Sequence, residues 1–250
     1  MEPLSTFVHH GNDTVARGAL PTHASVTLSD LARALRHVWW LGGGSCAGKT
    51  SVARRLASEC GVHTYHCDEH FEAHCQRVDK HRHPYFFHIK DLRPEELWMR
   101  PVPVQVAELT GFYDEEFDMV VDDLLALGSA RPVLVEGAGL RPARVAPLLT
   151  RAGQALWLTA TDEFRRRTYP DRGPFVAELL GQCSDPDKAR DHWMRRDALR
   201  AAALERELRD LELPHLVVDG TLDLLQTVTY VQRYFGWEGS MAGRVQWRGR

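Results

Sequence analysis

The sequence lacks any hydrophobic run long enough to cross a membrane. Its longest apolar stretches, at residues 133–135 and 155–158, fall far short of the roughly 20 residues that a transmembrane helix needs. The N-terminal residues also lack an apolar segment after a basic start, which is the pattern of a secretory signal. These absences predict a protein without a membrane partner, and we expect it in the cytoplasm.

Neither a charge excess nor a cysteine pattern points to a special partner or compartment. The formal net charge is −3, so no basic field exists that would attract nucleic acid. The 5 cysteines are odd in number and follow no repeated spacing, which favours reduced thiols over a disulfide framework. A small molecule is therefore the expected partner.

Short apolar segments alternate with amphipathic helical patterns along most of the chain. Strands are expected at 39–41, 63–67, 132–136, 155–158 and 215–219, and helices at 31–38, 50–60, 114–127, 187–211 and 222–235. Alternation with short links predicts an α/β fold with a doubly wound, five-stranded parallel sheet and helices on both faces.

Four segments lie outside this rhythm. Residues 1–25 and 237–250 are expected to be a flexible arm and tail, so that the folded domain spans 26–236. Residues 69–115 are dense in His, Phe, Trp, Tyr and Pro, which indicates an insertion that carries substrate contacts. Residues 162–186 include an Arg-rich stretch that could form a lid.

The most specific motif matches the pattern GxxxxGK[ST] at every fixed position and lies between an expected strand and an expected helix. Glycines let backbone amides approach a polyphosphate, and the start of the next helix adds its positive end. Lys49 would reach the β and γ phosphates, and Thr50 would bind Mg²⁺. The residues expected to bind ATP here are Gly43, Gly44, Ser45, Cys46, Ala47, Gly48, Lys49, Thr50 and Ser51.

Two carboxylates follow expected strands at the same edge of the sheet. Asp68 could accept the proton of a substrate hydroxyl, or it could cap the next helix, and these two roles are compatible. Glu136 ends the strand PVLVE, where it could reach Mg²⁺ or its water, although a strand-end residue can also simply face solvent.

Several arginines follow the fourth expected strand. Arg165, Arg167 and Arg172 could fold over the γ-phosphate and exclude water, which a phosphoryl transferase must do. The alternative is a solvated charged helix face, and Arg166 is the residue that this alternative fits best.

The insertion and its surroundings also supply candidate substrate contacts. An aromatic wall could be formed by Tyr85, Phe86, Phe87, Trp98 and Tyr113, although ordinary packing is the alternative for each. His70 could line the same site, and Arg141 could reach an anionic group or lie in solvent. The His and Cys residues at 63–75 lack paired CxxC blocks, which disfavours a structural zinc site.

Together, the segments GGGSCAGKTS, HCDEHF, VLVEG, the Arg-rich stretch and VVDGT resemble the P-loop kinases of small molecules. The pattern is similar to the branch that includes uridine kinase, phosphoribulokinase and the chloramphenicol phosphotransferase-like enzymes. The resemblance implies a five-stranded parallel core, an Arg-bearing lid, and ATP with Mg²⁺ as the donor. It also implies that Asp68 is the base or a metal-organising carboxylate, and that Gly220 and Thr221 lie near adenine.

The insertion departs from this family, so the acceptor is left open. The sequence predicts an ATP-dependent kinase that acts on a hydroxyl of a nucleoside-, sugar- or antibiotic-like molecule. No NKxD sequence is present, which disfavours a GTPase. The alternative is a nucleotide-dependent switch or accessory ATPase that acts on a protein partner.

Overall fold

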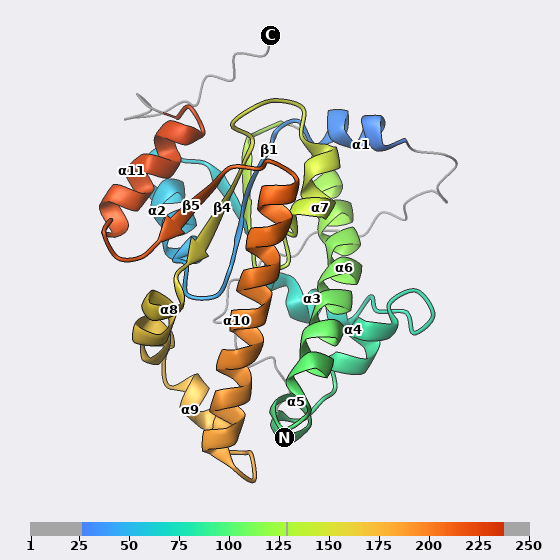
Figure 1. Ribbon diagram of the computed structural model, residues 1–250. Coiled ribbons are helices and arrows are strands. Elements are labelled where there is room, and N and C mark those ends of the chain that lie inside the picture. Colours follow the sequence, from blue (N-terminus) through green and yellow to red (C-terminus); the bar gives the residue numbers. More distant parts are fainter. Residues whose placement is uncertain (1–26, 129, 238–250) are drawn as a thin grey trace.

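The computed structural model describes residues 27–128 and 130–237 (Figure 1). The expected arm at 1–25 lies outside the described residues, as does the expected tail from residue 238 onward. Trp237 belongs to that expected tail, but its ring packs against Trp39 with 5.4 Å between centroids. The folded domain thus extends at least to Trp237.

The described strands form one five-stranded, wholly parallel sheet, as predicted. Its order is β2-β3-β1-β4-β5. From β1 the chain crosses to β2, beyond β3, whereas from β3 it crosses to β4 on the other side of β1. The carboxyl ends of β1 and β3 therefore form the switch point at which open α/β sheets bind ligands. The bounds are β1 Val38–Gly43, β2 His63–His66, β3 Val133–Glu136, β4 Ala155–Ala160 and β5 His215–Val218.

Helices cover both faces of the sheet (Figure 1). Alternate strand residues point to opposite faces, so Trp40 and Trp157 pack under α6 and α10, whereas Leu41 and Leu156 pack under α2 and α11. The helices are α1 Leu28–Ala34, α2 Lys49–Cys60, α3 Phe71–Cys75, α4 Pro84–Ile89, α5 Pro94–Trp98, α6 Val102–Ala126, α7 Pro142–Val145, α8 Asp162–Thr168, α9 Phe175–Leu180, α10 Pro186–Asp210 and α11 Leu224–Tyr234. In the described part of the chain, 3-10 turns span Cys67–His70, Ala146–Leu148 and Tyr169–Arg172.

Helix α6 is much longer than the sequence pattern predicts. It begins at Val102, within the expected insertion, and only its second half coincides with the expected helix at 114–127. Pro103 lies in the first turn, where a missing N–H costs no hydrogen bond, so it does not break the helix. The insertion is therefore tied to the domain core, since one continuous helix belongs to both.

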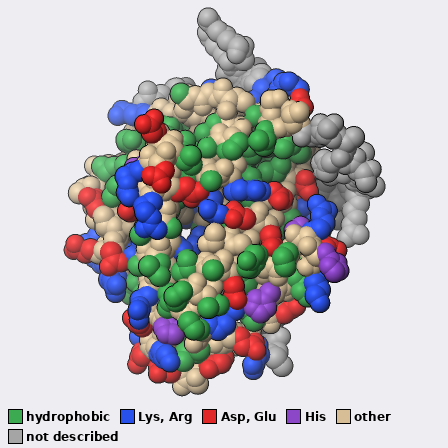
Figure 2. Space-filling model, turned by 45° about the vertical axis from the view of Figure 1, so that its right-hand side comes forward, with side chains coloured by type: hydrophobic (Ala, Val, Ile, Leu, Met, Phe, Trp, Pro, Cys, Tyr) green, Lys and Arg blue, Asp and Glu red, His purple; other side chains and the backbone are tan. Residues whose placement is uncertain are grey.

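One face of the molecule has a mixed surface. On the face in Figure 2, acidic, basic and apolar side chains are interspersed. Among the described helices, none is both long and apolar enough to span a bilayer.

Candidate active site

The loop between β1 and α2 has the backbone conformation that only certain residues tolerate. Gly43 has φ +140°, and a Cβ there would lie 2.1 Å from the carbonyl oxygen of Leu158 on β4. Gly48 has φ +78° and precedes the first residue of α2. Cys46 adopts φ +61°, a conformation that is costly for a residue with a side chain. The loop therefore includes left-handed backbone conformations, one of them at the non-glycine residue Cys46, which cost conformational free energy.

Lys49, the first residue of α2, is buried at the loop. Its Nζ donates a 2.8 Å hydrogen bond to the carbonyl oxygen of Gly44, and only 9% of the residue is exposed. Burial lowers the pKa of Lys49, while the carboxylates of Glu136 and Asp68 act in the opposite direction. The predicted phosphate-binding lysine therefore lies close to both predicted carboxylates.

Glu136 at the end of β3 is joined to α2 and to β2. Its Oε1 accepts a 3.0 Å hydrogen bond from Oγ1 of Thr50 and lies 2.8 Å from Nδ1 of His66. Burial by itself would raise the pKa of Glu136, but the His66 hydrogen bond and the charge of Lys49 outweigh it and hold the pKa below its ordinary value. Glu136 is therefore a carboxylate, and Nδ1 of His66 donates to it.

Hydroxyl and carboxylate oxygens, as in Thr50 and Glu136, are the ligands that Mg²⁺ prefers. In the described part of the chain, no group of three or more His, Cys, Asp or Glu side chains is placed to hold a metal ion. A magnesium ion that takes most of its ligands from phosphates and water fits this arrangement, because it needs only one or two protein ligands.

Asp68 lies in the 3-10 turn that follows β2. The N-terminal cap of this turn is His66, and the cap of α3 after it is His70, and neither cap makes a side-chain hydrogen bond. The alternative role of Asp68 as a helix cap is therefore wrong. Burial raises the pKa of Asp68, as does the charge of Glu136, while Lys49 and Arg172 lower it. The charges of Asp68 and of Lys49 in the phosphate loop therefore act on each other.

A cavity of about 220 Å³ opens beside Asp68. Its walls come from the turn after β2, from the insertion, from the Arg-rich segment and from α10. We call it the aromatic cavity, and it is lined by Asp68, Phe71, Glu72, Ile89, Leu97, Trp98, Leu109, Phe112, Tyr113, Glu116, Arg172, Trp193 and Arg196. It brings apolar rings and charged groups together over the end of β2.

The structure separates the predicted lid arginines. Arg172 lines the aromatic cavity and lies over the rings of Tyr169 and Trp193, 5.5 Å from each centroid. Arg165 is buried and forms an ion pair with Asp162 of its own helix, outside the lining of either cavity.

Arg167 lies away from both cavities, beside the loop that follows β5. Its guanidinium is over the ring of Phe164 at 5.2 Å, and a Cβ added to Gly220 would come within 2.6 Å of its Nη2. Thr221 in the same loop donates a 2.7 Å hydrogen bond to Asp219. The loop after β5 therefore brings Gly220 and Thr221 close to Arg167, at the edge of the sheet.

Of the predicted aromatic wall, Trp98 and Tyr113 line the aromatic cavity, whereas Tyr85, Phe86 and Phe87 do not. Phe86 is fully buried, stacked on Phe71 at 5.5 Å, and belongs to the packing of the insertion. Tyr85 is 45% exposed and covers Gly111 of α6. The ring of His70 stacks on Tyr65 at 3.8 Å instead of facing the cavity.

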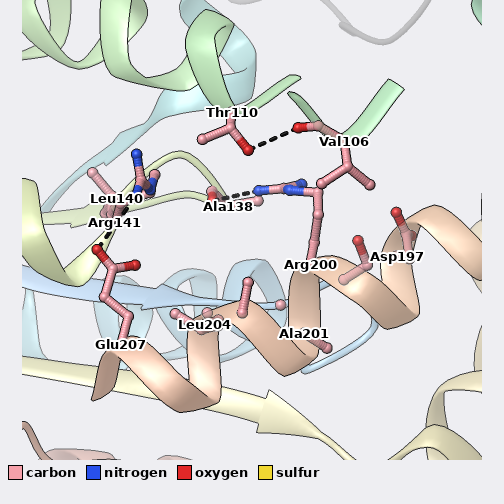
Figure 3. Close-up of a pocket in the computed structure, with 14 residues that line it drawn as sticks. Val106, Thr110, Ala138, Leu140, Arg141, Asp197, Arg200, Ala201, Leu204 and Glu207 are labelled. Carbon is pink, nitrogen blue, oxygen red and sulfur yellow. Dashed lines mark hydrogen bonds and ion pairs between the residues drawn. The ribbon is translucent and has the colours of Figure 1, made fainter. Parts of the chain in front are cut away.

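Arg141 lies at a second, smaller cavity of about 100 Å³ between the phosphate loop, α6 and α10 (Figure 3). It donates to Asp114 at 2.5 Å and to Glu207 at 3.4 Å. We call this the loop cavity, because Gly43, Gly44 and Ser45 line it. Both guanidinium contacts are to carboxylates, so Arg141 is already engaged.

Helix α10 contributes site residues that the sequence reasoning missed. Arg196 lines the aromatic cavity, and Asp197 and Arg200 line the loop cavity. Arg200 lies over the ring of Tyr113 at 4.5 Å and reaches the carbonyl oxygen of Ala138 at 3.5 Å (Figure 3). The sequence feature that could have identified them is the four-residue spacing of Arg196 and Arg200, which places both side chains on one face of a helix.

No family model and no curated protein sequence matches this chain. Among solved structures, it is similar to shikimate kinase from Bacteroides thetaiotaomicron, with 16% identity, a TM-score of 0.44, and coverage of 80% of this chain and 97% of that one. It is also similar to shikimate kinase from Acinetobacter baumannii, with 20% identity, a TM-score of 0.40 and coverage of 83% and 98%. A gluconokinase from Sinorhizobium meliloti shares 15% identity at a TM-score of 0.39, with coverage of 80% and 91%. Likeness at this level does not define an activity, which has to be argued from the side chains.

Proposed function

We propose that this protein is an ATP-dependent phosphotransferase that moves the γ-phosphoryl group to a hydroxyl of a small molecule. One observation carries the proposal. Cys46 of the phosphate loop packs in one cluster with Trp98 and Trp193 of the aromatic cavity, and the charges of Asp68 and Arg172 in that cavity act on Lys49. The cavity and the loop therefore share a boundary, which is where a donor phosphate and an acceptor hydroxyl need to meet.

The loop side of this boundary would hold the nucleotide. The amides of residues 43–50 and the ammonium of Lys49 would bind phosphate oxygens. Thr50 and Glu136 would hold Mg²⁺, which when bound neutralises negative charge between the phosphates. Gly220, Thr221 and Arg167 would lie on the side of the adenine.

The cavity side would bind the acceptor. Asp68 has the raised pKa that makes a carboxylate a better proton acceptor, and Arg172 would stabilise charge on the transferring group. The rings of Trp98, Tyr113 and Trp193 would exclude water, which limits wasteful hydrolysis. Nucleoside-, sugar- and antibiotic-like alcohols are the acceptor classes that we propose.

The test is a screen of the purified protein with Mg-ATP against hydroxylated metabolites and antibiotics, with mass detection of a phosphorylated product. We expect Asp68→Asn to abolish acceptor phosphorylation while it leaves nucleotide binding in place. Asp91→Asn is the matched control, because Asp91 is exposed and forms an ion pair with the adjacent Lys90, away from both cavities. Acceptor-independent hydrolysis that survives Asp68→Asn, without any phosphorylated product, would replace this proposal with the nucleotide-dependent switch.

A further inference from the structure

Glu116 is a buried carboxylate in the wall of the aromatic cavity. Only 5% of the residue is exposed, and it lies on α6 one turn after Phe112 and Tyr113, which line the same cavity. Its Oε1 faces Nδ1 of His74 at 3.3 Å. Its Oε2 has no hydrogen-bond partner among residues 27–128 and 130–237, and Glu116 is one of the residues that line the cavity. A buried carboxylate oxygen without a donor is costly, and a ligand that donates to it removes that cost.

His74, which does not line the cavity, contacts Oε1 of Glu116 and so orients its carboxylate. Its ring is fully buried, and its Nε2 lies 3.0 Å from Oδ2 of Asp123. Burial alone would lower the pKa of His74, but the hydrogen bonds to Asp123 and Glu116 outweigh it and raise the pKa. The ring is thus shared between two carboxylates, and its nitrogens face Oε1 of Glu116 and Oδ2 of Asp123.

The two arginines that line the aromatic cavity, Arg172 and Arg196, contact groups other than Glu116. Arg196 donates to Asp197 at 2.8 Å and lies over the ring of Trp98 at 4.5 Å. Arg172 lies over Tyr169 and Trp193 and acts electrostatically on Lys49, at the phosphate loop. Neither has a contact with Glu116 within the described chain, while Asp68 and Glu72 add negative charge to the same lining.

From this arrangement, and building on the proposed phosphotransferase function, we propose that the acceptor carries a protonated amine besides its hydroxyl, and that Glu116 binds this amine. An ammonium donates a charge-assisted hydrogen bond to the free oxygen, and the carboxylates of Glu116, Asp68 and Glu72 in the same lining attract its charge. A neutral hydroxyl can donate only a weaker hydrogen bond because it carries no charge, and a carboxylate is repelled. Glu116 is therefore a specificity-determining residue for an amino alcohol with an apolar ring or ring face.

The experiment compares matched probes by calorimetry, with no nucleotide present. One set is trans-4-aminocyclohexanol, cyclohexane-1,4-diol and trans-4-hydroxycyclohexanecarboxylate, and the other is glucosamine, glucose and glucuronate. Within at least one set, we expect the amine to bind about ten-fold or more tightly than the neutral alcohol, as a charged hydrogen bond implies, and the acid to bind most weakly. Equal or weaker binding of both amines, or no binding of either, would overturn the inference.

The variant Glu116→Gln keeps the shape of the side chain and removes its charge. We expect it to weaken amine binding about ten-fold while the affinity for the neutral alcohol stays nearly constant. Glu163→Gln is the control, since Glu163 is exposed on α8 and does not line the cavity. If melting shows that Glu116→Gln does not fold, Glu116→Asp keeps the charge and should retain the preference for the amine. Loss of that preference in a folded Glu116→Asp protein, or its survival in a folded Glu116→Gln protein, contradicts the assignment.

Binding without nucleotide separates this inference from the proposed function. An amine preference that depends on Glu116, but with no phosphorylated product when Mg-ATP is added, would refute only the phosphotransferase. Phosphorylation of neutral or acidic alcohols by a protein that shows no amine preference would refute only the role of Glu116.

Discussion

Thr50 donates a 3.0 Å hydrogen bond to Glu136 and thereby joins the first turn of α2 to the end of β3, 86 residues away in sequence. The contact fixes the two proposed oxygen ligands of Mg²⁺ relative to each other at the switch point of the sheet. Because magnesium is selective for ligand geometry, we expect the geometry of this contact to matter more than its strength.

Glu136→Gln tests this pair directly. The amide keeps the size of the side chain but removes the charge that would face Mg²⁺, so we expect turnover to fall on the order of 100-fold. The magnesium concentration for half-maximal activity should rise as well. Steady-state rates over a magnesium titration measure both effects, and an unchanged magnesium requirement would argue against Glu136 as a ligand.

His66 gives a second test, since its Nδ1 donates to the same oxygen of Glu136. His66→Leu removes this donor, and we expect the magnesium requirement to rise with a smaller loss of turnover at saturating magnesium. His66→Asn retains a donor and should recover most of the wild-type magnesium dependence. If Asn and Leu behave alike, the histidine only fills space.

We expect Lys49→Met to weaken nucleotide binding without lowering the stability of the folded protein. Burial lowers the pKa of Lys49, so the folded protein holds an ammonium at a cost in free energy that Met does not carry. We expect the melting temperature to stay constant or rise, while calorimetry shows nucleotide affinity about ten-fold or more weaker because a charged hydrogen bond is lost. Unchanged affinity for Mg-nucleotide would count against the phosphate loop.

The cluster behind the cavity predicts how stability varies with pH. Burial would raise the pKa of Asp123, but hydrogen bonds from His74, Arg77 and Tyr65 outweigh it and lower the pKa to about 2. Its contribution to the free energy of unfolding, on the order of 2 kcal/mol, is present above its unfolded pKa of about 3.9 and is lost as the pH falls toward 2. The raised pKa of His74 adds stability that is complete below about pH 6.5 and is lost as the pH rises through the folded value.

Asp123→Asn checks this prediction by urea denaturation at several pH values. The variant should be less stable than the wild type at pH 5, and the difference should shrink between about pH 4 and 2. Asp122→Asn, the neighbouring acid on α6, serves as the control. A difference that stays constant over this acid range would show that Asp123 does not titrate as described.

We expect replacement of Gly111, in the middle of α6, to lower the free energy of unfolding, although helix propensity alone would predict the opposite. Ala is better than Gly in a helix by about 1 kcal/mol, yet a Cβ at Gly111 would lie 2.4 Å from the ring of Tyr85. We expect Gly111→Ala to destabilise the wild type and to stabilise a Tyr85→Ala protein, as a double-mutant cycle of unfolding free energies would show. Additive effects would mean that the ring moves aside freely.

The phosphate loop and the sheet could be predicted from sequence because their signals are local. Residues 43–50 match a fixed pattern, and the apolar segment before Glu136 is long enough to read as a buried strand. The order of the strands is not a local property, and neither is the pairing of Glu136 with His66 across neighbouring strands.

The acceptor side was harder to predict because aromatic residues serve both cavities and cores. Phe86 and Trp98 look equivalent in sequence, but Phe86 is enclosed by other rings of the insertion and Trp98 is stacked on Trp193 at the cavity, 3.9 Å apart. That second ring comes from α10, nearly a hundred residues later, so no local pattern could distinguish the two.

Helix α10 carries a structural consequence for both halves of the site. Trp193 and Arg196 face the aromatic cavity, whereas Asp197 and Arg200 face the loop cavity, all within little more than two turns. An α-helix behaves as a stiff rod over such a distance. The aromatic cavity and the loop cavity therefore share one rigid wall, and any axial slide or roll of α10 would change the volumes of both cavities together.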